Sequence, residues 1–148
     1  MRDNPDLERF DHDDAWLLGT ALVVQCRERE LPVTIAIHLG EQRVFHAALP
    51  GTSADNDRWV ERKTHIVQRF GIASAEVAER YVADGDFSGF LTAFALSPER
   101  YFPAGGAVPI RVRGSLVGVL AISGLESTED HDLAVSVLTS LATEGGHA

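Results

Sequence analysis

The residues best suited to bind a ligand or take part in chemistry are cationic side chains on two predicted elements. Arg62 and Lys63 fall on a long helix predicted in the middle of the chain. Arg111 and Arg113 share one face of a predicted strand. Because helices pack on sheets, these four groups could converge, and converging ammonium and guanidinium groups bind carboxylates and phosphates. The sequence therefore predicts an anion site, filled either by a small ligand or by an acidic group of a neighbouring subunit.

Lys63 has an unusual position on its helix. At about 100° per residue it projects from the middle of an apolar sector, whereas Arg62 falls on a basic stripe that we interpret as facing solvent. Because an unpaired buried charge is costly, the Lys63 ammonium must either reach water along its aliphatic stem or find a partner. The apolar sector consists of Trp59, Val60, Ile66, Val67 and Phe70, and the stripe of Arg58, Arg62, His65 and Arg69.

Asp130 and His131 form a pair of titratable groups at the start of the last predicted helix. The positive end of the helix dipole stabilises Asp130 as an anion there and favours the neutral form of His131. The pair could transfer protons, but capping the helix is the favoured role. His38 and His46 lie on predicted strands without a clear third ligand, so we interpret them as strand residues and not as a metal site.

No recognised catalytic arrangement accompanies these residues. The sequence offers no defensible Ser-His-Asp arrangement, phosphate-binding glycine loop or metal-ligand spacing. Gly105 and Gly106 are not followed by a helix, as a phosphate loop must be, so we assign them to backbone geometry at the start of a strand. A binding role is therefore favoured over an enzymatic one.

Residues 105–124 organise the predicted fold as a β-hairpin. Leu116 to Ile122 is apolar without alternation, which indicates a central strand covered on both faces. Gly114 and Ser115 predict a type II′ turn, because glycine takes the positive φ of its first central position. The predicted fold class is α/β (α+β), an antiparallel sheet with helices packed on its faces. The predicted strands are 33–39, 42–49, 107–113 and 115–123, and the predicted helices are 14–29, 54–70, 74–83 and 128–143.

The first helix and the segment before the hairpin supply further apolar residues. On the first helix Leu17, Ala21 and Val24 share a face with Leu18 nearby, and Cys26 is predicted as a buried thiol. Residues 87–96 are not assigned to an element, and 101–104 are read as an additional strand. The aromatic residues of this region could serve a core or an interface between copies of the chain; they are Phe87, Phe90, Phe94, Tyr101 and Phe102.

Length and charge bound the class of protein. The 148 residues, 45% of them hydrophobic, predict one domain with residues 1–11 and 144–148 flexible. The formal charge of −9, from 22 acidic and 13 basic residues, disfavours nucleic acids and anionic membranes as partners. Because neither a signal peptide nor an apolar run near the ~20 residues of a membrane span is found, we expect a cytoplasmic protein.

Several motifs, in order along the chain, resemble one protein family. The resemblance to the carboxy-terminal signature of the haem-degrading-domain family, also called GlcG-like or HbpS-like, rests on Gly105, Gly106, Ala107, Val108, Pro109, Ile110, Gly114, Gly118, Ser123 and Gly124. Motifs that look like a smaller, largely uncharacterised bacterial and fungal branch are Gly51-Thr52, Asp55-Asn56, Trp59, Arg62-Lys63 and Asp130-His131. The resemblance covers residues 17–141. It implies a profilin-like fold and assembly into homodimers or larger homo-oligomers.

The resemblance also implies haem as one candidate ligand, because some family members bind it. His65 or His131 would then be the axial ligand, and a haem propionate the anion. No strong haem-attachment pattern is present, so haem ranks below another small anionic ligand. An oligomeric ligand-binding or sensor protein is the favoured hypothesis, an oligomeric scaffold the alternative, and a haem-binding or haem-degrading protein the third. The predicted ligand-binding residues are Asn56, Trp59, Arg62, Lys63, Arg111, Arg113, Asp130 and His131.

Overall fold

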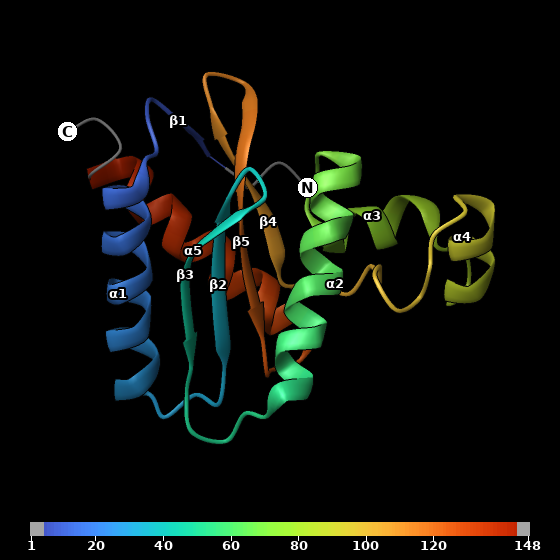
Figure 1. The fold of residues 1–148 in the computed structure, drawn as a ribbon, viewed down its shortest axis with the longest axis horizontal. Coiled ribbons are helices and arrows are strands. Elements are labelled where there is room, and N and C mark those ends of the chain that lie inside the picture. The colour runs from blue at the N-terminus through green and yellow to red at the C-terminus, as the bar shows by residue number, and fades with distance from the viewer. Residues whose placement is uncertain (1–4, 145–148) are drawn as a thin grey trace.

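The computed structural model describes residues 5–144, which form five helices and one five-stranded sheet. The strand order is β1-β4-β5-β2-β3 (Figure 1). The eight elements with predicted bounds all occur, with ends within two residues of the prediction. The strands are β1 (Asp6–Leu7), β2 (Thr34–Leu39), β3 (Gln42–Ala48), β4 (Ala107–Val112) and β5 (Ser115–Ser123). The helices are α1 (His12–Glu28), α2 (Ala54–Phe70), α3 (Ser74–Tyr81), α4 (Phe87–Ala93) and α5 (Ser127–Glu144).

β5 lies at the centre of the sheet, antiparallel to β4 on one side and to β2 on the other. This confirms the prediction of a central strand, and its residues 118–123 are buried. The sheet also contains β1, which the sequence does not predict. β1 pairs with β4 in parallel, and the Arg113 N–H donates to the Leu7 carbonyl at 3.1 Å.

The sheet is therefore mixed and not wholly antiparallel. Residues 6–7, which fall in the lead that the sequence predicts to be flexible, belong to the sheet instead. Residues 1–4 and 145–148, which the sequence also predicts to be flexible, lie outside the described residues.

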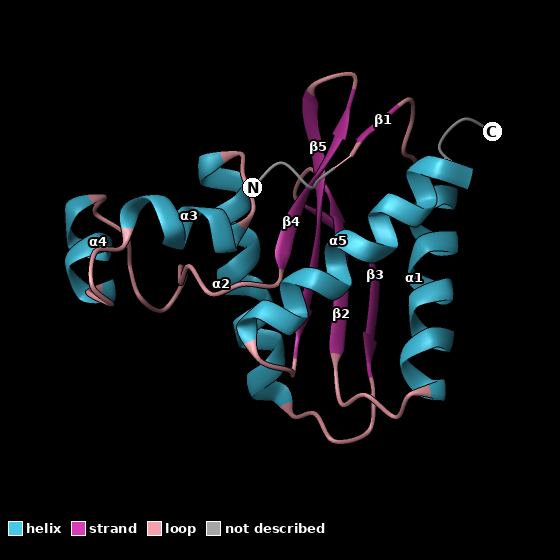
Figure 2. Cartoon of the chain, turned by 180° about the vertical axis from the view of Figure 1, so that it is seen from behind, coloured by secondary structure: helices cyan, strands magenta, loops and turns pink. Residues whose placement is uncertain are grey.

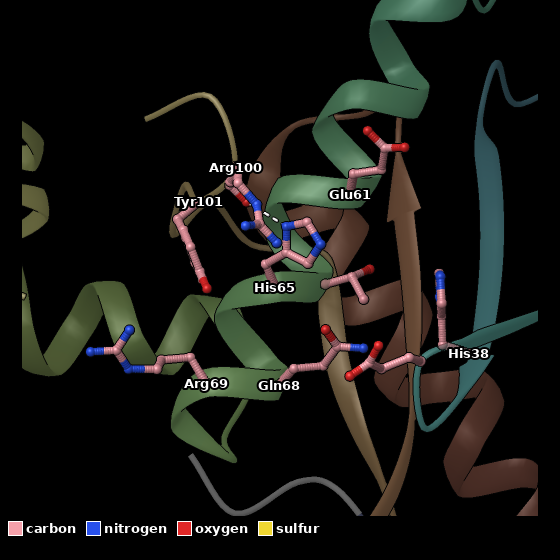
Figure 3. Close-up of a pocket in the computed structure, with 9 residues that line it drawn as sticks. His38, Glu61, His65, Gln68, Arg69, Arg100 and Tyr101 are labelled. Atoms are coloured by element: carbon pink, nitrogen blue, oxygen red, sulfur yellow. Dashed lines mark hydrogen bonds between the residues drawn. The ribbon is translucent and has the colours of Figure 1, made fainter. Parts of the chain in front are cut away.

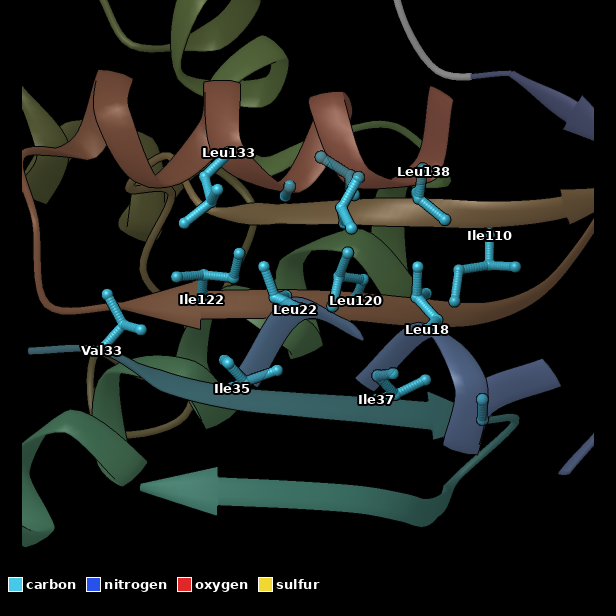
Figure 4. Close-up of a cluster of buried hydrophobic side chains, with 14 of the residues drawn as sticks. Leu18, Leu22, Val33, Ile35, Ile37, Ile110, Leu120, Ile122, Leu133 and Leu138 are labelled. Carbon is cyan, nitrogen blue, oxygen red and sulfur yellow. The ribbon is translucent and has the colours of Figure 1, made fainter. Parts of the chain in front are cut away.

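Helices cover both faces of the sheet. α2 packs on the face seen in Figure 1, and α1 and α5 pack on the other, which Figure 2 shows from behind. The alternation of β2 directs Ile35 and Ile37 into the α1 and α5 layer and the small Ala36 toward α2. The larger side chains thus fill one core layer (Figure 4), whereas small residues allow α2 to approach the sheet closely.

α1 buries a different face from the one the sequence suggests. Its buried stripe includes Leu18, Leu22 and Cys26, so the buried thiol is confirmed. Leu17 and Val24 are 60% and 57% exposed. Apolar residues occupy most of this helix, so their spacing alone does not select the face that meets the sheet.

α3 and α4 extend from α2 to one side of the sheet (Figure 1) and carry a core of their own. Three aromatic residues of this core, Phe70, Phe90 and Phe94, pack with the exposed Tyr81, and the four ring centroids lie 5.1 to 6.4 Å apart. Several aromatic residues considered for an interface are therefore used inside the chain. Residues 101–104 are a loop and not the expected strand, since Pro103 has no N–H to donate to a ladder.

The turn between β4 and β5 differs by one residue from the prediction. Val112 pairs with Ser115, so the two loop residues are Arg113 and Gly114, with φ of 51° and 83°. Positive φ at both central positions defines a type I′ turn and not the expected type II′ turn. Arg113 accordingly lies at the tip of the hairpin.

Candidate functional site

The site is built where α2, the carboxyl end of β5 and the start of α5 meet. Lys63 reaches from α2 into this junction, where its Nζ donates to the Ile122 carbonyl at 2.9 Å and to Asp130 Oδ2 at 3.2 Å. Lys63 is 3% exposed and Asp130 is 1% exposed. Of the two possibilities left open by the sequence, pairing and not solvent access accounts for the charge of Lys63.

The glycine pair before β4 makes room for this contact. A Cβ on Gly106 would lie 2.4 Å from the Ile122 carbonyl oxygen and 2.7 Å from Lys63 Nζ, and the φ of Gly106 is +133°. A Cβ on Gly105 would lie 2.5 Å from the Ser127 carbonyl oxygen. The prediction that the pair serves backbone geometry is confirmed, and the geometry lets Lys63 reach a residue of the helix on the far side of the sheet.

Burial sets the proton affinities of the pair. Burial lowers the pKa of Lys63, although the charge of Asp130 opposes this shift. Burial also raises the pKa of Asp130, against the effects of the Lys63 charge and the Leu125 N–H, which donates to Asp130 Oδ1 at 3.0 Å. The sequence predicts an anion stabilised by the helix terminus at position 130. Desolvation outweighs that effect and raises the pKa of the Asp130 carboxyl group.

A polar cavity of about 310 Å³ adjoins the pair. The Lys63 ammonium has three N–H donors, and two of them have partners among residues 5–144. Lys63 is also the only lysine of the chain, beside twelve arginines. The lining residues are Asn56, Trp59, Lys63, Ala104, Ser123, Gly124, Leu125, Ser127 and Asp130. The cavity therefore brings together four of the predicted site residues.

An apolar cavity of about 480 Å³ lies next to it and shares Trp59, Ala104 and Ser127 with it. Phe87 and Phe102 contribute aromatic walls. His131 also lines this cavity and is 5% exposed, and neither of its ring nitrogens has a hydrogen-bond partner within residues 5–144. Because buried polar groups are nearly always paired, this imidazole is an unusual feature of the wall.

Trp59 lines both cavities and is held from two sides. Its ring meets Phe102 edge to face, with centroids 5.3 Å apart. The guanidinium of Arg62 lies 4.1 Å from the centre of the Trp59 ring, a cation–π contact. The Arg62 side chain thus supports the cavity through Trp59, and its Nε donates to the Arg58 carbonyl at 3.3 Å.

Asn56 connects α2 to β5. Its Oδ1 accepts from the Ser53 N–H at 3.0 Å within a capping box, and its Nδ2 donates to Ser123 Oγ at 3.3 Å. His46 of β3 contacts Asp57 Oδ1 at 2.6 Å and anchors the same turn of the helix. These contacts fix the end of α2 that carries the cavity.

The structure does not bring Arg111 and Arg113 to Lys63. Arg111 lies five residues beyond Gly106, or roughly 16 Å along β4 at ~3.3 Å per residue. Its guanidinium donates to the Gly71 carbonyl at the end of α2. The expected cluster of four cations is therefore not assembled, because the periodicity of β4 gives the face of each arginine but not its height on the sheet.

A third cavity, of about 370 Å³, lies on another flank of α2, toward β2 (Figure 3). His65 Nδ1 donates to the Arg100 carbonyl at 2.6 Å. His65 and Arg69 line this cavity, and Arg69 is exposed, as predicted for the basic stripe. Burial lowers the pKa of His38, whose Nδ1 has no partner in the described part of the chain. Within residues 5–144 no three His, Cys, Asp or Glu side chains are placed to hold a metal ion.

The sequence does not single out Ser123, Leu125 or Ser127 as site residues, although they line the polar cavity. Ser123 belongs to a Ser-Gly motif, and Ser127 directly precedes the predicted helix 128–143. These residues could have been predicted from a glycine motif or a helix cap that follows a buried strand.

These features define an α+β domain with ligand-sized cavities where α2 and α5 meet the sheet. The family model described as "Haem degrading protein HbpS-like" matches residues 10–139, and the chain belongs to this HbpS-like family. A UPF0303 protein of Streptomyces coelicolor is 47% identical over 131 residues, which are 88% of this chain and 82% of that protein.

Solved structures share the fold. The crystal structure of the Ybr137w protein is similar with a TM-score of 0.83 and 33% identity, over 93% of this chain and 81% of that one. The crystal structure of a PduOC–haem complex is similar with a TM-score of 0.74 and 20% identity, over 88% and 94% of the two chains. In the described range, no helix is long and apolar enough to cross a membrane.

Proposed function

We propose that this protein binds a small organic anion in the two adjoining cavities between α2 and α5. One observation carries the proposal: the buried imidazole of His131, whose nitrogens have no partner among residues 5–144, lines an apolar cavity that shares three lining residues with the polar cavity at Lys63. A buried polar group without a partner costs about 1–3 kcal/mol, so a ligand that hydrogen-bonds to it is favoured.

The walls indicate the chemistry of the ligand. Trp59 and Phe102 offer aromatic faces to a planar apolar body. The third N–H of Lys63 and the polar edge of the neighbouring cavity suit a carboxylate at one end of that body. Since Asp130 already balances the charge of Lys63, we expect modest affinity for inorganic anions and higher affinity for anions with an aromatic body.

Titration calorimetry with 2-naphthoate tests this proposal. Ala104 lines both cavities, so Ala104→Trp reduces the space in both and leaves Lys63 and His131 in place. We expect saturable binding to the native protein and at least a roughly tenfold weaker affinity for Ala104→Trp, a loss of about 1.4 kcal/mol. Ala93→Trp, on an exposed position of α4, is the matched control and should bind as the native protein does. Equal affinity of all three proteins would exclude these cavities.

Haem is a second candidate, because a protein of the same fold is known as a haem complex and His131 lines an apolar cavity. In this chain His131 would hold the iron and Lys63 would face a propionate. Haem would supply redox chemistry at its iron, but we do not expect the purified protein to degrade it. A Soret shift on haemin addition that His131→Phe abolishes would support haem binding. Loss of that band with a reductant and oxygen would contradict the expected lack of degradation.

We also propose that copies of the chain associate through the outer face of α1. Trp16, Leu17 and Val24 are 62%, 60% and 57% exposed there, an apolar stripe on one helix. A purely structural, oligomeric role remains the alternative to ligand binding. It predicts association without binding of 2-naphthoate.

A further inference from the structure

We propose that Lys63 is a reactive amine that binds aldehydes or 2-oxo acids covalently, as a Schiff base, in the polar cavity beside Asp130. The inference rests on the proposed function, because the same cavity is the polar end of the proposed ligand site. It names the functional group that the ligand presents there.

The presence of lysine at position 63 supports a role as a nucleophilic amine and not only as a positive charge. Every other basic side chain apart from histidine is arginine, and the single lysine is the one that is buried beside a cavity. Arginine holds a permanent charge and pairs better with a carboxylate, whereas lysine can lose its proton and attack a carbonyl carbon. A role as a counter-charge alone gives no reason for lysine at this position.

The neighbours of Lys63 Nζ provide a route for its proton. Asp130 Oδ2 is 3.2 Å away, and the Leu125 N–H holds the other carboxylate oxygen at 3.0 Å. The carboxylate is thus fixed with one oxygen toward the amine. Burial, which lowers the pKa of Lys63 and raises the pKa of Asp130, favours transfer of the proton between them.

The reaction balances without an oxidant or a metal. The ammonium of Lys63 gives one proton to Asp130, and the neutral amine attacks the carbonyl carbon to form a C–N bond. The carbonyl oxygen takes up that proton and a second one from the nitrogen by way of Asp130, and leaves as water. The product is an iminium with one N–H and one positive charge, which can remain paired with Asp130.

The space beside Lys63 suits a small carbonyl compound. The cavity of about 310 Å³ is lined near the pair by the small residues Ala104, Ser123, Gly124 and Ser127. Lys63 is 3% exposed, and its Nζ has the Ile122 carbonyl as a second partner. Solvent access to the amine is therefore limited, which protects an imine from hydrolysis.

Reductive trapping tests the inference. The folded protein is incubated with glyoxylate and cyanoborohydride at pH 7, and adducts are located by peptide mass mapping. Because Lys63 is the only lysine of the sequence, an adduct on a lysine side chain can form at this position alone. We expect a carboxymethyl group on Lys63, formed roughly tenfold faster than on free Nα-acetyl-lysine. Asp130→Asn should slow trapping by roughly tenfold at a similar circular dichroism spectrum. Lys63→Arg should show no adduct at this position.

The outcomes separate this inference from the proposed function. Modification of Lys63 only after unfolding in urea, or at the rate of the free amino acid, would overturn the inference. If 2-naphthoate still binds in that case, the ligand site stands and only the covalent chemistry is refuted. Trapping in the native protein and in Ala93→Trp, but not in Ala104→Trp, would support both.

Discussion

At the scale of single residues, the Lys63–Asp130 pair determines what the site can do. A lysine and a carboxylate that are nearly inaccessible to solvent must form an ion pair with each other or lose their charges. Their mutual contact stabilises the charged forms, and burial favours the neutral ones. A buried ion pair of this kind is weak evidence for a gain in folding stability. Titratable groups with shifted pKa values are common at sites where protons are exchanged.

Breaking the pair should be costly. We expect Lys63→Met to lower the free energy of unfolding by about 3–5 kcal/mol, because it leaves Asp130 buried without its counter-charge. The double variant with Asp130→Asn should recover most of this loss, since the amide can still accept from the Leu125 N–H. Urea denaturation measures both. Arg69→Met, on an exposed side chain, is the control, and a similar small effect for Arg69→Met and Lys63→Met would contradict the pairing.

His38 should make stability depend on pH. Burial lowers the pKa of His38 below its ordinary value of 6.5, so the unfolded chain binds more protons than the folded one between the two values. Stability should therefore rise as the pH rises through that window, and fall on acidification. His38→Asn should flatten this part of the curve of unfolding free energy against pH. The same substitution at the exposed His12 should leave the slope due to His38 intact, and an unchanged slope in His38→Asn would refute the assignment.

At the scale of elements, Gly106 links the strand β4 to the ion pair. We expect Gly106→Ala to lower the free energy of unfolding by about 3 kcal/mol or more, because a Cβ would clash with the Ile122 carbonyl and with Lys63 Nζ. Gly40→Ala is the matched control, since its φ is also positive but its Cβ would meet nothing within 4 Å. It should cost only about 1 kcal/mol. Thermal unfolding distinguishes the two, and equal losses would show that space at Gly106 is not limiting.

Local sequence patterns predict some of these elements and contacts but not others. α2 and β5 could be predicted because a 3.6-residue period and an unbroken apolar run are local signals. β1 could not, since two residues gain their pairing only from β4. The place of Lys63 on α2 leaves both solvent access and pairing possible, and its partner, 67 residues away, depends on how α5 crosses the sheet. For the same reason the sequence could not tell that Arg111 lies at the other end of β4.

At the scale of the whole molecule, the surface of α1 is the feature that the fold leaves unexplained. Leu17 and Val24 face solvent although both residues suit a core. We expect Leu17→Glu, Val24→Glu or the pair of changes to convert an oligomer into smaller species in light scattering at micromolar concentration. Leu116→Glu, at another exposed apolar position, should not. A native protein that is already monomeric would contradict association through α1.

The central claim is that the adjoining cavities at α2 and α5 hold the ligand, and a crystal structure of the complex with 2-naphthoate tests it most directly. The ring should lie between Trp59 and the His131 imidazole, with its carboxylate within hydrogen-bond distance of Lys63 Nζ. Electron density for the ligand only in the cavity lined by His38 and His65, or only on the outer face of α1, would contradict the claim.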